Sequence, residues 1–480
     1  MAASLAAIVS FSQWQFKLDT AFRTQIIHEY VNSLILQPDG KLIVSGVMRF
    51  PSEISDKRLV RTLVDGTRDE SYNNSGLGGG KLAPWLNGKF YVGSGQGVRR
   101  ILQSGQNDPS YILLSQSPYV TPIQGGDYHV FEDGRVLITG SHQLSDSIRG
   151  FVGSYQLIWF SNEGYLDTTR IHRQANGHMW RFTALPNGKF LCSCNCTLYD
   201  GQPVGRVFRI HGDGALDTSF LSNIANGHAW AYHAIQDGRT YLAGRFTRSQ
   251  DPEDTLHIAR FNEDGSLDET FIPPHFGPGE PPTLTSGVGI TFIYPWHDGS
   301  LIIGGQFRSV NGQSRNSICL IDSTGALMSG FEAQGVGPFT YFSNTYATVD
   351  FITEDDQGRL YINGTYTGYN NGTINDPGQR FVSRLLVEEI NVAVQEEENS
   401  RSFLIQPNPT HGSVNFTFNP AIGRSSSITI RDIHGRELAT LPIREGSDRL
   451  EWNAADLAPG IYLVSFGSGG SVSTQKLVVN

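Results

Sequence analysis

The sequence has little charge, few cysteines and no long hydrophobic run. Only 17 % of its 480 residues are charged, and the formal net charge is −10, which argues against a surface built to attract nucleic acid or anionic lipid. Four cysteines are too few for a disulfide scaffold. No apolar run reaches the roughly 18 residues that a membrane-spanning helix needs, so we predict no transmembrane segment and no nucleic-acid partner.

Sequence patterns typical of catalysis are also missing. The chain contains no His-Glu-x-x-His motif, no G-x-S-x-G nucleophile elbow and no Walker loop. Asp39, Asp133, Asp237 and Asp298 recur before glycines in turns, where an Asp side chain accepts a hydrogen bond from the backbone two residues further on. We therefore predict no catalytic residue and no metal ligand among these aspartates.

Glycine, in contrast, is abundant, with 54 residues, and 11 % of the residues are aromatic. This composition favours an all-β fold with many turns and sizeable cores. A turn motif, mostly Asp-Gly or Asn-Gly between two apolar runs, recurs at intervals of 46 to 61 residues. Such a turn is the strongest short signal for a β-hairpin. The seven motif glycines are Gly40, Gly88, Gly134, Gly188, Gly238, Gly299 and Gly358.

A second turn motif follows in each of the first six units, and an aromatic residue closes most copies. Each unit therefore supplies about four short strands, which is typical of a propeller blade. The seventh unit stops at Leu386, and its missing outer strand is found at the other end of the chain, in residues 16–22. Because a closed ring needs such a strand, the sequence predicts a seven-bladed β-propeller over residues 13–390, with six or eight blades as alternatives.

The two ends of the chain differ from the repeat. We interpret residues 1–12 as the remnant of a secretory signal peptide, with a short leader as the alternative, and the acidic residues 391–402 as a linker. Residues 403–480 are strand-like again and predict a small, Ig-like β-sandwich. The alternating apolar residues that predict half-buried strands there are Val414, Phe416, Phe418, Ile428, Ile430, Ile461 and Leu463.

The two repeat motifs carry a family resemblance. An "LD-small-small-Phe" ending stands at Leu18 to Phe22, Leu216 to Phe220 and Leu267 to Phe271, and a "DGK-aliphatic-Gly" hairpin precedes most copies. Together they resemble the delta-60 repeat family. The resemblance covers most of residues 16–390 and implies propeller architecture, but it implies no particular activity.

Three segments near the C-terminus form an ordered set, at residues 406–412, 430–436 and 457–479. This set resembles the C-terminal sorting domain of type IX (Por) secretion in Bacteroidota. The resemblance implies the type IX machinery as a partner, passage through the outer membrane, and a secreted or cell-surface location. The sorting-motif residues that it implies are Pro407, Asn408, Pro409, Gly412, Gly435, Gly460, Tyr462 and Lys476.

One local duplication suggests a binding site. The hexapeptide at 175–180 recurs with one change at 225–230, between the outer strand of one unit and the inner strand of the next. In a propeller these connections line a rim of the central channel, where His–Trp pairs could stack on a sugar or an aromatic ligand. The alternative is a packing motif that fills two blades identically. The candidate ligand-binding residues are His178, Trp180, His228, Trp230 and, on inner strands, His129 and His233.

Two further groups suggest metal or redox chemistry only weakly. Cys192, Cys194 and Cys196 alternate along one strand, and we predict small buried thiols there. A soft-metal site is the alternative, because three thiolates could ligate such an ion. The spacing of roughly 6–7 Å between alternate residues is at the limit for a disulfide. Residues 262–268 carry Asn and Asp, but they lack the closing Glu of an EF-hand. We therefore predict no cofactor, with Ca²⁺ as the alternative.

The sequence as a whole predicts a secreted or surface-attached monomer that binds a glycan, a peptide or an envelope protein without catalysis. A polysaccharide-acting enzyme with its site at the channel mouth is the second hypothesis, and it requires two carboxylates about 5–9 Å apart. A structural spacer is the third.

Overall fold

The chain divides into two compact units, Ser12–Ile390 and a unit that contains Asn391–Asn480. The predicted leader lies outside the described residues up to residue 9, and the predicted linker lies outside them over 394–401. The computed structural model describes residues 10–72, 78–94, 97–112, 116–279, 287–332, 335–372, 374–393, 402–419, 426–432, 436–468 and 471–480.

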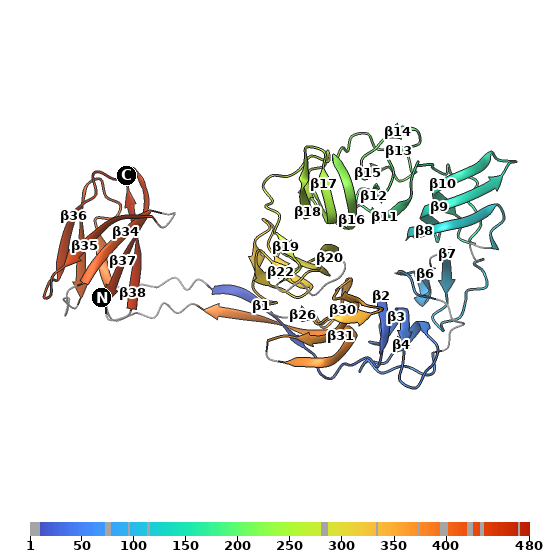
Figure 1. Ribbon diagram of the computed structural model, residues 1–480, viewed down its shortest axis with the longest axis horizontal. Helices are drawn as coiled ribbons and strands as arrows, with labels where there is room; N and C mark the ends of the chain where they lie inside the picture. Colours follow the sequence, from blue (N-terminus) through green and yellow to red (C-terminus); the bar gives the residue numbers. More distant parts are fainter. Residues whose placement is uncertain are drawn as a thin grey trace. The chain divides into compact units, whose positions relative to one another are not determined.

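Of the sheets in the described part of the first unit, seven form a ring of blades and three are small additional sheets, so the prediction of seven blades is confirmed (Figure 1). Within each blade the strands follow one another across the sheet in chain order, except that β1, from the N-terminus, pairs with β31 in blade 7. Blades 1 to 3 are β2 (His28–Leu36), β3 (Leu42–Arg49) and β4 (Lys57–Thr62); β5 (Leu82–Pro84), β6 (Phe90–Ser94) and β7 (Gly97–Ile101); and β8 (Val120–Val130), β9 (Val136–Asp146) and β10 (Phe151–Phe160). Blades 4 and 5 are β11 (Met179–Ala184), β12 (Phe190–Cys194) and β15 (Val207–Ile210), and then β16 (Ile224–Ala234), β17 (Thr240–Arg248) and β18 (Asp251–Phe261). Blade 6 is β20 (Gly289–Pro295), β21 (Leu301–Gln306), β24 (Ile318–Ile321) and β25 (Leu327–Met328), and blade 7 is β29 (Phe351–Glu354), β30 (Leu360–Asn370), β31 (Asn375–Ala393) and β1 (Ser10–Leu18).

The hairpin turns of the blades have the predicted chemistry. All seven motif glycines have positive φ, between 70° and 89°, a conformation that L side chains rarely adopt. The carboxylates of Asp39, Asp133, Asp237 and Asp298 accept hydrogen bonds from the backbone N–H two residues further on, at 2.9 to 3.3 Å. The structural role predicted for these aspartates is confirmed.

The fourth strand of the unit is shorter than the sequence predicts. In blades 1 to 5 it is reduced to one isolated antiparallel bridge after the third strand, such as Ile210 with Leu216 in blade 4. A two-residue strand, β25, occupies this position in blade 6. A turn of a few residues that packs one aromatic side chain therefore replaces a full outer strand.

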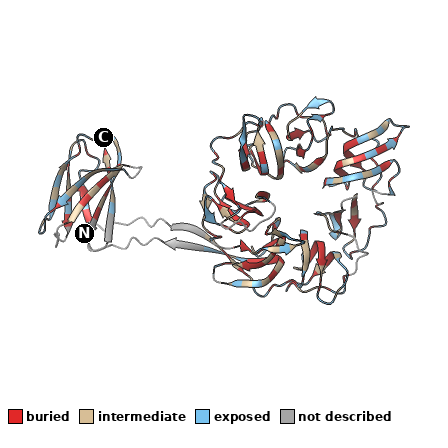
Figure 2. Cartoon of the chain, viewed as in Figure 1, coloured by how far each residue is buried: buried red, intermediate tan, exposed pale blue. Residues whose placement is uncertain are grey.

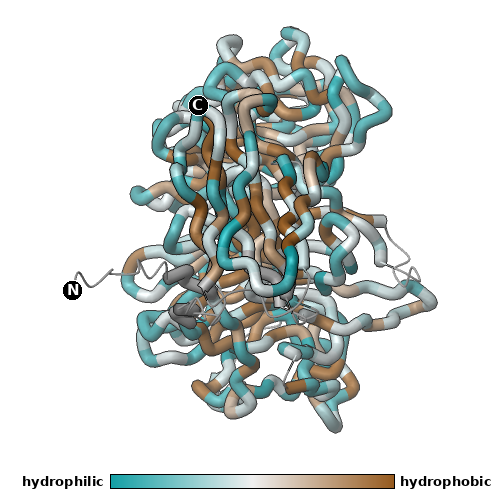
Figure 3. Tube along the Cα trace, turned by 90° about the vertical axis from the view of Figure 1, so that its left-hand side faces the viewer, coloured by the Kyte–Doolittle hydropathy of each residue, from teal (hydrophilic) through white to brown (hydrophobic). Residues whose placement is uncertain are grey.

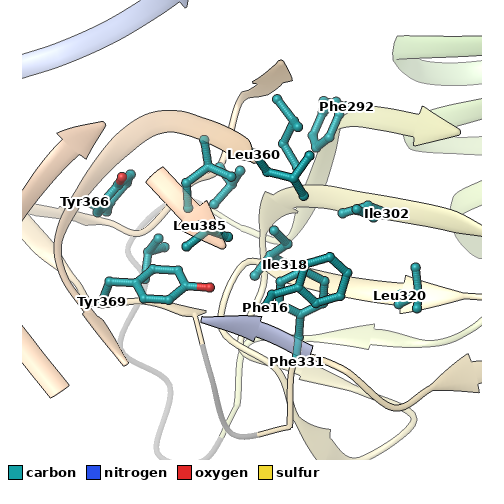
Figure 4. Close-up of a cluster of buried hydrophobic side chains, with 14 of the residues drawn as sticks. Phe16, Phe292, Ile302, Ile318, Leu320, Phe331, Leu360, Tyr366, Tyr369 and Leu385 are labelled. Atoms are coloured by element: carbon teal, nitrogen blue, oxygen red, sulfur yellow. The ribbon is translucent and has the colours of Figure 1, made fainter. Parts of the chain in front are cut away.

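The N-terminal strand closes the ring, as predicted. β1 pairs with β31, and the Asp19 N–H donates to the Arg384 carbonyl oxygen at 2.9 Å. Phe16 of β1 is fully buried and stacks on Phe331 of blade 6, with ring centroids 4.1 Å apart. Figure 4 shows this cluster, to which Leu360 and Leu385 of blade 7 and Ile318 of blade 6 also contribute.

The cores of the propeller lie between neighbouring blades. The second strand of most blades is almost entirely buried, as in β3, β12 and β21, because each sheet is covered on both faces (Figure 2). One apolar cluster joins blades 3 and 4, and another joins blades 5 and 6. This packing explains the low charge of the sequence.

A buried arginine and an aspartate link the two repeat motifs at the outer part of five blades. We call this pair the Arg–Asp clamp. In blade 5, Arg260 Nε donates to Asp268 Oδ2 at 2.6 Å, and Arg239 from the first turn motif donates to the same oxygen at 2.7 Å. The five Arg–Asp pairs are Arg61–Asp69, Arg100–Asp108, Arg209–Asp217, Arg260–Asp268 and Arg384–Asp19.

The clamp also connects consecutive blades. Arg100, Arg209, Arg260 and Arg384 each donate a further hydrogen bond to a backbone carbonyl of the next blade, at 2.6 to 2.8 Å. Because the ring closes, Arg384 of blade 7 reaches Val64 of blade 1. A buried guanidinium thus satisfies its donors within its own blade and across the interface.

The second unit contains a β-sandwich of two sheets. The first sheet consists of β32 (Ser402–Gln406), β33 (Ser413–Asn419) and β36 (Arg449–Asn453), and the second of β35 (Glu437–Ile443), β34 (Ser426–Asp432), β37 (Gly460–Ser468) and β38 (Ser471–Val479). Val414, Phe416, Phe418, Ile428 and Ile430 are buried between the sheets, as predicted. Figure 3 shows hydrophobic and hydrophilic residues alternating along these strands.

The prediction for β37 is wrong about the buried face. Ile461 and Leu463 are 48 % and 40 % exposed, whereas Tyr462, Val464 and Phe466 belong to the core. Residues 461–464 are all apolar, so alternation alone does not distinguish the two faces of this strand.

Candidate functional site

The first strands of the seven blades surround a cavity of about 970 Å³. All seven blades contribute lining residues, and most of these residues lie on the innermost strand or just before it. Volumes of this size are typical of small-molecule sites. The cavity is therefore the place to look for a ligand.

One backbone feature directs side chains into the cavity. The innermost strands of blades 1, 4, 5 and 6 each carry a β-bulge, at which one residue lacks a partner on the second strand. A bulge turns a side chain out of the regular alternation and is common beside functional sites. The extra residues are Asn32, Trp180, Trp230 and Thr291, and all four line the cavity.

The bulged position has a fixed place in the repeat. It lies eight residues before the motif glycine, and the residue at this position lines the cavity in every blade. The ring is strongly asymmetric, because blades 4 and 5 carry tryptophan at this position whereas blades 1, 6 and 7 carry polar side chains. In blade order the residues are Asn32, Gly80, Gly126, Trp180, Trp230, Thr291 and Asp350.

The structure brings the two predicted His–Trp pairs together. The ring centroids of His178 and Trp180 are 4.1 Å apart, those of Trp180 and His228 are 6.0 Å apart, and those of His228 and Trp230 are 6.5 Å apart. All four side chains are half-buried and lie outside the cores between the blades. Their role as ligand contacts stays a prediction.

Ring nitrogens at this site are buried without hydrogen-bond partners among the described residues. They are Nε2 of His178, Nε1 of Trp180 and Nδ1 of His228. The other nitrogen of His178 lies 3.1 Å from Ser141 Oγ. A buried polar atom is costly unless it is satisfied, so these nitrogens are suited to a bound polar ligand or to water.

The surroundings of the histidines at the site favour the neutral form. Burial lowers the pKa values of His178 and His228, and the charge of Arg206 lowers that of His228 further. His142 lines the cavity, is only 1 % exposed, and has its pKa lowered to about 4 by burial. Neutral imidazoles offer one donor and one acceptor each, which suits recognition of hydroxyl groups.

His129 and His233 lie on the inner strands β8 and β16, as predicted, but they do not line the cavity. His129 packs edge-on against Phe131 and Phe190, with centroid distances of 4.7 and 5.2 Å. The ring of His233 stacks on Tyr241. The structure therefore separates these two histidines from the four-residue group.

The cavity also contains charged side chains that the sequence motifs did not reveal. The Lys81 ammonium donates to Asp127 Oδ1 at 2.8 Å, and Arg181 lies 4.0 Å from Asp127 Oδ2. Burial raises the pKa of Asp127, but Lys81 and Arg181 lower it more, so the carboxylate stays ionised. On blade 7, burial raises the pKa of Asp350 to about 6, although the hydroxyls of Thr348 and Thr291 lower it.

A single signal in the sequence could have identified these residues. Asp350 shares the position of Trp180 and Trp230 relative to the motif glycine, and Asp127 and Arg181 share the next position. Strict alternation of faces along a strand hides Asp127 and Arg181, because a bulge interrupts the pairing there, whereas Lys81 and Asp350 lie just before their strands.

The cysteines differ from the prediction. Cys194 and Cys196 form a disulfide, with Cα atoms 5.2 Å apart, while Cys192 and Cys319 are buried free thiols. The expected strand geometry ends too early for three alternating thiols, because β12 stops at Cys194 and the chain bends at Asn195.

The candidate Ca²⁺ residues are engaged in other contacts. Asp268 belongs to a clamp, and Asp264 accepts hydrogen bonds from the N–H and hydroxyl of Ser266. Among the described residues, no group of three or more His, Cys, Asp or Glu side chains is arranged to hold a metal ion.

Several of the residues implied for sorting meet at one end of the sandwich. Asn408 Nδ2 donates to the Lys476 carbonyl at 2.6 Å, and the Val478 N–H donates to Asn408 Oδ1 at 2.8 Å. Pro407 and Pro409 flank Asn408, and the Gly412 carbonyl accepts from Ala454. The Tyr462 hydroxyl donates to the Ala458 carbonyl, and Gly460 begins β37; Gly435 lies outside the described residues.

Comparison with known families matches both parts of the chain. Residues 404–480 match the model of the secretion system C-terminal sorting domain. Residues 37–72, 196–220, 235–271 and 297–331 match a β-propeller model described as a domain of unknown function (DUF5122). The chain is a repeat β-propeller with a secretion sorting domain. The sorting domain marks it for secretion and attachment to the cell surface. None of the helices described here has the length and apolar character to cross a membrane.

Solved structures with a similar arrangement are distant in sequence. An oligogalacturonate lyase from Vibrio parahaemolyticus is 11 % identical, with a TM-score of 0.45 over 79 % of this chain and 98 % of the lyase. A gluconolactonase from Xanthomonas campestris is 14 % identical, with a TM-score of 0.33 over 81 % of this chain and all of that protein. An extracellular domain from B. thetaiotaomicron, described as part of a hybrid two-component system, is 9 % identical with a TM-score of 0.38 over 99 % of this chain, which spans 60 % of that domain's length. The search of curated proteins gives no match. Likeness at this level bears on neither substrate nor activity.

Proposed function

We propose that this secreted propeller is a binding module that holds a glycan in its central cavity. One observation carries the proposal: two adjacent blades present half-buried His–Trp pairs, and three of their ring nitrogens, on His178, Trp180 and His228, lack partners among the described residues. Trp180 and Trp230 line the same cavity of about 970 Å³.

The chemistry of the ring suits a sugar better than a purely apolar ligand. Sugars combine an apolar face of C–H groups with hydroxyls at the edge, so they need an aromatic surface and several hydrogen-bonding groups together. Trp180 and Trp230 supply the aromatic surface, while Asn32, Thr291 and Asp350 supply polar groups at the same level of the ring.

Binding of the full-length protein to a glycan array, followed by titration calorimetry with the best ligand, tests the proposal. We expect a glycan ligand whose affinity falls when Trp180 or Trp230 is changed to alanine. If the array is negative and the same surface instead captures a peptide or an envelope protein, the glycan assignment is wrong.

A polysaccharide-acting enzyme is the second candidate, and the cavity carboxylates favour it. Asp127 stays ionised, whereas Asp350 has a pKa of about 6, and opposite displacements of two carboxyl groups are typical of acid–base pairs. Under this hypothesis Asp350→Asn abolishes turnover of the bound glycan but leaves its binding intact. If the wild-type protein binds the glycan stably and releases no products, the enzyme hypothesis is wrong and the binding function remains.

The sorting domain supplies a separate test of location. Deletion of residues 403–480 is expected to leave the protein in the periplasm, because the exported form requires this address. Fractionation of cells with an antibody against the propeller measures the outcome, and unchanged surface delivery contradicts it. A monomeric state stays a prediction, for which light scattering of the full-length protein is the direct measurement.

A further inference from the structure

The cations of the cavity have unequal partners. Lys81 donates to Asp127 Oδ1 at 2.8 Å and to the Tyr128 carbonyl at 3.0 Å, and Asp127 also accepts from the Tyr128 N–H. These bonds pair the Lys81 ammonium of blade 2 with acceptors of blade 3. The charges of Lys81 and Asp127 therefore neutralise each other.

Arg181 is different. No hydrogen bond of its guanidinium is found within the described part of the chain, and its nearest carboxylate oxygen, Asp127 Oδ2, is 4.0 Å away. Its side chain is 48 % exposed and lines the cavity. A guanidinium has five N–H donors in a planar fork, so Arg181 retains most of its capacity to bind an anion.

The position of Arg181 places this capacity beside the aromatic surface. Arg181 follows Trp180 at the bulge of β11, and both residues line the cavity. A sugar stacked on Trp180 would therefore present its ring substituents within reach of a cation. A carboxylate or a sulfate ester would complete the donor set of the guanidinium in bidentate geometry.

We propose that Arg181 binds the anionic substituent of an acidic sugar, so that the ligand of the cavity is an acidic glycan rather than a neutral one. The inference rests on the proposed glycan-binding function and narrows it. The net charge of −10 does not oppose it, because charges farther away than the Debye length of about 8 Å are largely screened at physiological salt.

Matched ligand pairs test the inference with the full-length protein. An alginate oligosaccharide is compared with its carboxyl-reduced form, and a carrageenan oligosaccharide with its desulfated form, by titration calorimetry. We expect at least one acidic member to bind about tenfold more tightly than its neutral counterpart. Preference within the alginate pair identifies a carboxylate, and preference within the carrageenan pair identifies a sulfate ester.

Variants of one residue complete the test. Arg181→Gln is expected to remove the preference, and Arg181→Lys to restore part of it, because lysine retains the charge but lacks the fork. Arg149→Gln is the matched control, since Arg149 is 47 % exposed and lies outside the cavity. Equal affinity for both members of each pair overturns this inference and leaves glycan binding intact, whereas a protein that binds no glycan overturns the proposed function itself.

Discussion

Aspartates occupy repeated positions both in the outer clamps and around the central cavity, but their surroundings differ. In the clamp of blade 1, the Ser71 hydroxyl and the Arg61 guanidinium lower the pKa of Asp69 to about 2. At the cavity, burial raises the pKa of Asp350 to about 6. The clamp carboxylates are saturated with donors, whereas Asp350 has hydroxyl partners and only one distant cation, so the same residue type serves stability in one region and is available to a ligand in the other.

Two blades extend this comparison because they lack the Arg–Asp pair. Blade 6 has Leu320 and Met328 at the positions of the clamp arginine and aspartate, so both charges are replaced together. Blade 3 keeps Asp167 but has Trp159 instead of the arginine, and Arg170 lies over the Trp159 ring. The clamp is therefore one solution among several for the same interface.

The largest effect is expected from breaking a clamp. Arg260→Leu removes the buried partner of Asp268, which keeps only the more exposed Arg239 as a cation, and removes the bond to the Ser323 carbonyl of blade 6. We expect a loss of about 3–5 kcal/mol in the free energy of unfolding, measured by urea titration, because removing one partner of a buried ion pair is costly. Lys57→Met, which breaks an exposed pair with Glu53, is the control and should cost less than about 1 kcal/mol.

A double variant that copies blade 6 distinguishes pairing from simple loss of contacts. Arg260→Leu combined with Asp268→Met recreates the apolar combination of Leu320 and Met328. We expect the double variant to be more stable than the sum of the single losses predicts, because no buried charge is left unpaired. Strict additivity would show that the two residues do not act as a pair.

The sequence predicts the repeating part of the fold well and the contacts between repeats poorly. Turn glycines, hairpins and the closing strand follow from local patterns, because each depends on a few neighbouring residues. The clamp was missed because its arginine lies among apolar residues of the third strand, and its partners come from two turns and the next blade. Asp127 and Arg181 were missed because a bulge changes which residues face inward, and Lys81 and Asp350 because they lie just before their strands.

The His–Trp site was predicted in part from the sequence. Duplication in the sequence identified His178 and Trp180 with His228 and Trp230, and the structure places all four at neighbouring positions. The same reasoning chose His129 and His233 from their distance to the motif glycine, five residues. At that position His129 contacts Phe190 of the next blade and His233 contacts Tyr241 of its own blade, whereas the position three residues earlier faces the cavity.

At the cavity, the largest effect is expected from removing an aromatic surface. Trp230→Ala should weaken glycan binding by about tenfold or more, because buried tryptophans dominate the energetics of such contacts. The free energy of unfolding should change less than in the clamp variants. Trp85→Ala, at a tryptophan that contacts Tyr91 and Arg100 outside the cavity, should leave the affinity unchanged, and an equal loss in both variants would contradict the assignment.

The pH dependence of binding tests the difference between the clamp aspartates and Asp350 at the cavity. Asp350 is neutral below its pKa of about 6 and charged above it, and the groups that act on it are the Thr348 and Thr291 hydroxyls and Arg181. Charged Asp350 would compete with an acidic ligand for Arg181, so affinity should fall roughly fivefold between pH 5 and pH 8, as expected for about 1 kcal/mol of like-charge repulsion. Calorimetry at both pH values measures this, and Asp350→Asn should bind equally at both.

The smallest effect is expected from the second cation of a clamp, and it tests what makes the clamp strong. Lys189 donates to Asp217 at 2.9 Å but is 25 % exposed, whereas Arg209 donates to the same oxygen at 2.6 Å and is 4 % exposed. Lys189→Met should cost only about 0.5–1 kcal/mol in urea titration, because Asp217 keeps its buried partner and water screens the lost charge. If this variant is as unstable as Arg209→Met, the number of cations around the carboxylate matters more than burial and the bond to the next blade. In that case the aspartates of the clamps and of the cavity would differ only in the number of cations around each carboxylate. The geometry of the arginine would then contribute nothing to the stability of the clamp.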